Sequence, residues 1–63
     1  MLNTQLANIS NRLLQLKHSR KTVIEYLALK LDDEDWRGVQ DAASHLRDID
    51  AEIKGLEIVS ASR

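Results

Sequence analysis

Two apolar stripes with the period of an α-helix run through the chain, and one acidic corner separates them. In residues 1–31 the apolar positions are alternately three and four residues apart, and the same spacing returns in residues 33–59. Side chains at that spacing lie along one side of a helix. Because the chain contains no proline, neither stripe is interrupted. The sequence therefore predicts a helix over about 3–30, a turn at 31–33 and a helix over about 33–59.

The stripe residues form the predicted core, which both helices share. Leu14, Ile24 and Leu31 widen the first stripe, as is typical of a helix in a bundle. Gly55 either continues the second helix or ends it, and we expect continuation because the stripe goes on beyond it. The predicted core and dimer residues are Leu6, Ile9, Leu13, Leu16, Val23, Leu27, Val39, Ala42, Leu46, Ile49, Ile53 and Leu56.

The acidic corner has the features of a helix start. Asp32 is a good N-cap, and the three acidic residues after it would lie where the helix dipole is positive. Leu31 and Trp36 have the spacing of a hydrophobic staple across this cap. A calcium-binding loop is the alternative, but Gly38 comes too late for the bend of such a loop. At the other end of the first helix, Asn3 or Thr4 is the predicted cap.

Two helices of similar length joined by a short turn are expected to pack antiparallel. A turn centred between residues 32 and 33 pairs residue i with residue 65 − i, so Leu16 faces Ile49 and Arg20 lies near His45. The predicted fold is an all-α, antiparallel helical hairpin that forms a single domain over residues 1–63.

A chain of 63 residues is marginally stable alone and usually needs a disulfide, a metal or a partner subunit. It has no cysteine, and its two histidines do not indicate a metal site, so we expect neither metal nor cofactor. Pairing through a two-fold axis would give a homodimeric four-helix bundle, with a different partner chain or a higher oligomer as alternatives. The absence of cysteine, of a leader-like start and of a long apolar run favours a cytoplasmic protein away from membranes.

Arg20 occupies a stripe position, where a charge is costly unless it is paired. Its stem can pack while its guanidinium reaches the bundle edge. A buried ion pair that sets the register, with Asp41 or Asp48, and a functional role are the alternatives.

Charge is segregated between the two halves. Residues 1–31 hold five basic side chains and one acidic, a net +4, whereas residues 32–63 hold nine acidic and four basic, a net −5. One interpretation is that the basic helix attracts the acidic one. The other is a face for a partner or nucleic acid, although no aromatic side chain in its basic half could stack on a base. That face comprises Arg12, Lys17, Arg20 and Lys21.

The sequence favours binding over catalysis, because no nucleophile has a base and an orienting group beside it. The only aromatic residues, Tyr26 and Trp36, would close the turn end of the bundle or act as contact points. We expect a dimeric module that binds a protein partner. The alternatives are an RNA- or DNA-binding hairpin and a structural assembly unit.

The segment Asp35-Trp36-Arg37-Gly38-Val39-Gln40-Asp41-Ala42-Ala43, with Leu46-Arg47-Asp48, resembles a segment of small phage and prophage proteins of unknown function. That resemblance implies a phage-type regulator or inhibitor. The predicted architecture is also similar to the Rop family of plasmid copy-number proteins, helical hairpins that dimerise and bind RNA hairpins. The aromatic residue that this family uses on its first helix has no counterpart here, so the resemblance does not extend to RNA binding.

Overall fold

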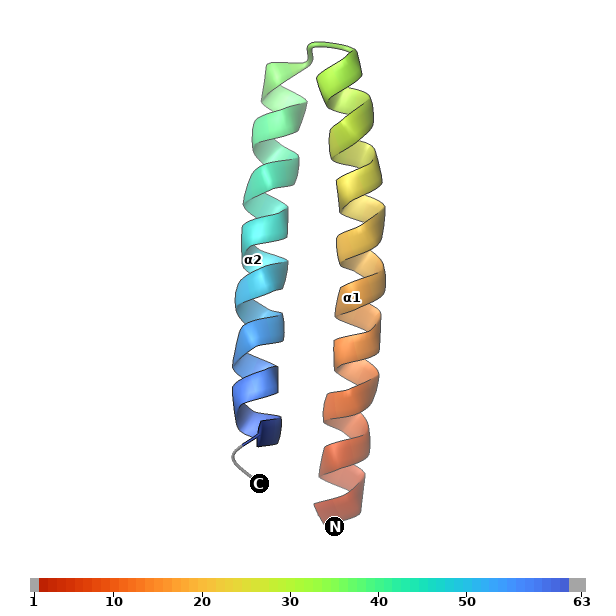
Figure 1. Cartoon of the computed structure of the whole chain (residues 1–63), viewed down its shortest axis with the longest axis vertical. Coiled ribbons are helices and arrows are strands. Elements are labelled where there is room, and N and C mark those ends of the chain that lie inside the picture. The colour runs from red at the N-terminus through yellow and green to blue at the C-terminus, as the bar shows by residue number, and fades with distance from the viewer. Residues whose placement is uncertain (1, 62–63) are drawn as a thin grey trace.

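The computed structural model describes the backbone of residues 2–61 and the side chains of residues 7–61. Two α-helices, α1 (Leu2–Asp32) and α2 (Trp36–Ala61), run side by side in opposite directions (Figure 1). The hairpin is long and thin, with extents of 48 × 15 × 12 Å. The prediction of an all-α helical hairpin is confirmed. Within the described residues, neither helix is long and apolar enough to cross a membrane.

The turn is built by backbone hydrogen bonds that end α1. The Asp35 N–H donates to the Lys30 carbonyl at 2.9 Å, and the Glu34 N–H donates to the Leu31 carbonyl at 3.0 Å. Together these bonds form a Schellman motif, which requires a left-handed residue at its fifth position. Glu34 is that residue, with a φ of 55°. The chain thus reverses at a glutamate in the left-handed conformation, which this residue type disfavours.

Asp35 starts the second helix, and this corrects the prediction that Asp32 is the cap. The Gly38 N–H donates to Asp35 Oδ1 at 3.0 Å, and the Val39 N–H donates to the Asp35 carbonyl at 2.9 Å. Asp32 instead lies at the end of α1. The sequence contains four consecutive acidic residues, 32–35, and each of them is a possible cap. Because the hydrogen bonds of the Schellman motif extend α1 into this run, only the fourth residue, Asp35, can cap α2.

The predicted staple between Leu31 and Trp36 is wrong for the same reason. With Asp35 as the cap, the two staple positions fall at Glu34 and Val39. Leu31 and Trp36 are 46% and 63% exposed. At the other end, α1 already includes Asn3 and Thr4, so neither residue precedes the helix as a cap.

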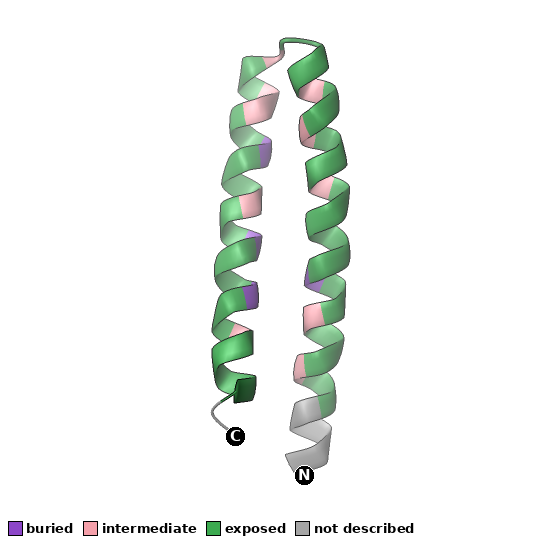
Figure 2. Ribbon diagram, viewed as in Figure 1, coloured by how far each residue is buried: buried purple, intermediate pink, exposed green. Residues whose placement is uncertain are grey.

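The core is a narrow strip between the helices. Leu16, Ile49 and Ile53 form its buried centre, and Leu13, Val23 and Leu56 pack against them. Figure 2 shows the most buried positions of α2 along the side that faces α1. Leu6 lies outside the described side chains. The other predicted core residues are buried (Leu16, Ala42, Ile49, Ile53) or half-buried (Ile9, Leu13, Val23, Leu27, Val39, Leu46, Leu56).

Candidate protein-binding surface

Three of the four candidate basic residues on α1 form ion pairs with α2. Arg12 Nε lies 2.8 Å from Glu52 Oε2, and Lys17 Nζ lies 3.8 Å from Glu57 Oε2. The hydrogen bond to Glu52 raises the pKa of the Arg12 guanidinium above its ordinary value. All these groups are about half exposed, so each pair adds little to stability. Basic side chains of α1 therefore form ion pairs with acidic side chains of α2 across the contact between the helices.

Arg20 is the third of these residues, and its partner differs from the predicted one. Its Nε lies 2.7 Å from Asp50 Oδ1, and the two side chains are 46% and 52% exposed. The alternative of a buried ion pair is wrong, because both side chains are about half exposed. The long Arg20 side chain reaches along α2 to a carboxylate at the edge of the contact, as the edge interpretation expected. Lys21 is exposed and forms no ion pair with any described residue.

The ion pairs and the seven-residue helical repeat define two opposite flanks of the hairpin. Residues seven apart lie on the same side of a helix. We call one side the ion-pair flank, because the Lys17–Glu57 and Arg20–Asp50 pairs cross it. It contains Lys17, Ile24 and Leu31 of α1, and Trp36, Ala43, Asp50 and Glu57 of α2. The other side, the groove flank, contains Arg12, Ser19 and Tyr26 of α1, and Gly38, His45 and Glu52 of α2.

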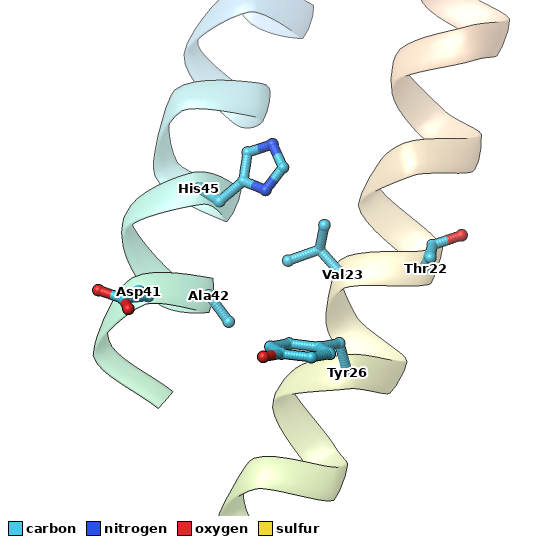
Figure 3. Close-up of a pocket in the computed structure, with 6 residues that line it drawn as sticks. All are labelled: Thr22, Val23, Tyr26, Asp41, Ala42 and His45. Atoms are coloured by element: carbon cyan, nitrogen blue, oxygen red, sulfur yellow. The ribbon is translucent and has the colours of Figure 1, made fainter. Parts of the chain in front are cut away.

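A shallow hollow of about 340 Å³ lies on the groove flank. Figure 3 shows Val23 and Ala42 facing each other across the helix contact, with the rings of Tyr26 and His45 beside them. The small Ala42 side chain does not fill the space opposite α1. The hollow is lined by Thr22, Val23, Tyr26, Asp41, Ala42 and His45.

A second hollow of about 240 Å³ adjoins the first, since His45 lines both. It lies farther from the turn, between Ser19 and Asp48, and reaches the Arg12–Glu52 ion pair. Together the two hollows make an open groove along one flank. Their lining mixes apolar surface with a few polar groups, which suits a protein side chain better than it suits a phosphate backbone.

Tyr26 is held beside the groove by contacts near the turn. Lys30 Nζ lies 5.1 Å from the centre of the Tyr26 ring and 3.5 Å from Asp35 Oδ2. Tyr26 and then Asp35 raise the pKa of Lys30, because both stabilise the ammonium. The hydrogen bond from Gly38, followed by Lys30, lowers the pKa of Asp35. The helix cap is thus connected to the aromatic ring at the groove.

Most of the large apolar side chains outside the core are exposed. Neither aromatic side chain is buried in the single hairpin, so neither closes its turn end. Leu14, Ile24, Tyr26, Leu29, Leu31, Trp36, Ile58 and Val59 are all exposed. A folded protein of this size rarely leaves so much apolar surface in water without a use for it.

The sequence did not reveal the groove, because a hollow depends on which side chains meet across the two helices. The sequence feature that could have indicated the groove is the small size of Ser19 and Ala42, which lie near the contact between the helices. Lys30 also lies at stripe spacing, three residues after Leu27, and the structure half-buries it. Among the described residues, no group of three or more histidine or acidic side chains could hold a metal ion.

Comparisons of the chain with protein-family models, with curated proteins and with solved structures find no match.

Proposed function

We propose that this chain is a non-enzymatic binding module, in which two hairpins pair into a dimeric four-helix bundle that occupies a protein partner. Its role would be that of a phage-type regulator or inhibitor. The module would act by covering a surface of its partner. In this proposal the helices serve as a rigid frame, and the exposed side chains provide the contacts.

The observation that carries the dimer in this proposal is the amount of surface that the single hairpin exposes. The chain exposes 4,991 Å², whereas a folded monomer of 7.2 kDa is expected to expose about 4,100 Å². The excess of about 900 Å² is close to the ~800 Å² that each partner buries in a standard protein interface. Two helices have only one mutual contact, so a hairpin leaves both flanks open.

The groove flank supplies the features of a partner site. Tyr26 presents an aromatic ring beside an apolar hollow, and aromatic side chains in such places dominate protein interfaces. Asp41 and His45 provide polar groups at the edge. A nucleic acid is a poorer fit, because the ion pairs already engage Arg12, Lys17 and Arg20.

The test is capture of a protein partner by immobilised protein, with variants that separate the groove from the rest of the surface. Wild-type protein should retain a polypeptide in stoichiometric amount from a lysate of the source cells. Tyr26→Ala should reduce that retention on the order of ten-fold, which corresponds to about 1.4 kcal/mol. Ile58→Ala is the control, because Ile58 is exposed but lines neither hollow.

Two outcomes would contradict the proposal. One is retention of RNA or DNA in place of a protein, which would favour the nucleic-acid alternative. The other is equal loss of the captured polypeptide with Ile58→Ala and Tyr26→Ala, which would mean that the groove has no specific part in binding.

A further inference from the structure

We infer that the second copy of the chain packs against the ion-pair flank. This inference rests on the dimer of the proposed function and assigns that dimer a face. The groove flank then stays open for the protein partner.

The half of the ion-pair flank nearest the turn is apolar. Ile24 and Leu31 are seven residues apart on α1, and Trp36 and Ala43 are seven apart on α2. We call these four residues the Trp36 patch. All four are exposed, with Trp36 63% exposed and Ile24 38% exposed. Tryptophan is among the residues that most often anchor interfaces, so this patch is a natural centre for one.

The Trp36 patch continues the core outward. Leu27 lies three residues after Ile24, and Val39 lies three residues after Trp36; both are only half-buried. A second hairpin placed on this flank would cover the patch and complete the burial of these core residues. The groove flank offers less apolar surface to a second hairpin, because Asp41, Asp48 and Glu52 lie along its hollows.

A second copy is the occupant that the surface area and the net charge both support. The excess exposed area matches what one partner contributes to a standard interface. A formal net charge of −1 means that two copies do not repel each other strongly.

The face is tested by sedimentation equilibrium and by the emission of Trp36, the only tryptophan, over a range of protein concentrations. Wild-type protein should be a dimer at micromolar concentration, and its emission should shift to longer wavelength as dilution exposes Trp36. Ile24→Gln should raise the dimer Kd at least ten-fold.

Leu29→Gln is the matched control for Ile24→Gln. Leu29 is on the same helix and is more exposed, at 64%, but it lies seven residues after Thr22, which lines the hollow. It should leave the dimer Kd within about two-fold of wild type, as expected for a site outside the interface. A larger effect for Leu29→Gln than for Ile24→Gln would overturn the assigned face while leaving the dimer, and so the proposed function, intact.

A folded monomer at micromolar concentration would overturn both the inference and the dimer of the proposed function.

Discussion

At the scale of single residues, the turn depends on two neighbours with different tasks. Glu34 adopts a left-handed backbone with φ of 55° to end α1, although that conformation costs a residue with a Cβ about 1–2 kcal/mol. Asp35 lies between the two helices and contributes to the ends of both. Its N–H completes the end of α1, and its carboxylate caps α2. The sequence indicated a cap in this acidic run but could not choose among its four carboxylates.

Glu34→Gly should stabilise the hairpin by about 1 kcal/mol, because glycine adopts the left-handed conformation without the steric cost. The measurement is the midpoint of urea unfolding at one fixed protein concentration, so that association does not affect the comparison. Asp33→Gly is the control, since Asp33 has no positive φ. A fall in the midpoint for Glu34→Gly, or an equal rise in both variants, would contradict this explanation of the turn.

Asp35→Asn should remove a pH-dependent part of the stability. The pKa of Asp35 is lowered in the folded state, first by the Gly38 hydrogen bond. The contribution of its charge is therefore complete above the unfolded pKa, near 3.9, and is lost as pH falls through the lower folded value. Asparagine can still accept the cap hydrogen bond but does not titrate.

The measurement for Asp35 is urea unfolding of both proteins between neutral and acidic pH. Wild type should be the more stable at neutral pH, and the difference should shrink as pH falls below about 4. The other carboxylates titrate in both proteins and cancel in the comparison. A difference that stays constant with pH would mean that the charge of Asp35 adds nothing to the cap.

At the scale of the helices, two glycines of α2 have different surroundings. A Cβ at Gly38 would lie 2.9 Å from Asp35 Oδ2 and 2.9 Å from Lys30 Cδ, whereas a Cβ at Gly55 would meet nothing within 4 Å. Gly38 therefore makes room for the cap and for Lys30 of α1. The absence of a side chain at Gly38 therefore lets the two helices approach closely near the turn.

Gly55→Ala should raise the free energy of unfolding by about 1 kcal/mol, because alanine costs less backbone entropy in a helix interior. Gly38→Ala should raise the free energy of unfolding clearly less, since its Cβ would displace Lys30 and Asp35 and weaken their contact. Both variants are compared by urea unfolding followed by helical circular dichroism. An equal gain at the two positions would show that the close contacts at Gly38 have no energetic effect.

At the scale of the whole molecule, the hairpin has one internal contact and two open flanks. Four residues are buried, and no polar side chain is among them in the described part of the chain. The ion pairs lie along the edges of the contact, where they align the helices more than they stabilise them. Stability and function are therefore both expected to depend on what covers the flanks.

The protein should not shift duplex DNA or hairpin RNA in an electrophoretic assay at low salt. Three of the four basic residues of the candidate face are paired with carboxylates of α2, and phosphates would have to displace those partners. Arg12→Gln and Lys21→Gln should accordingly change nothing. A salt-dependent shift that these substitutions weaken would restore the nucleic-acid alternative and contradict the protein-binding proposal.

The all-α hairpin and most of its core followed from the sequence, because helix period and apolar spacing are local properties of the chain. Eleven predicted core residues have described side chains, and all are buried or half-buried. The attraction between a basic and an acidic helix was also readable from the sequence. The individual ion-pair partners could not be predicted from the sequence. Arg20 pairs with Asp50 because a long flexible side chain selects among several carboxylates only once both helices are in place.

The spacing of the apolar residues is enough to predict that two amphipathic helices meet along one apolar strip near an acidic turn. The folding of the whole hairpin sets the end of α1 at Asp32 and the cap of α2 at Asp35, because the end of one helix limits where the next can begin. It also decided which flank is hollowed and which carries an exposed apolar patch. Those features arise from the packing of side chains distant in the chain, and packing is not encoded in the spacing of any one helix.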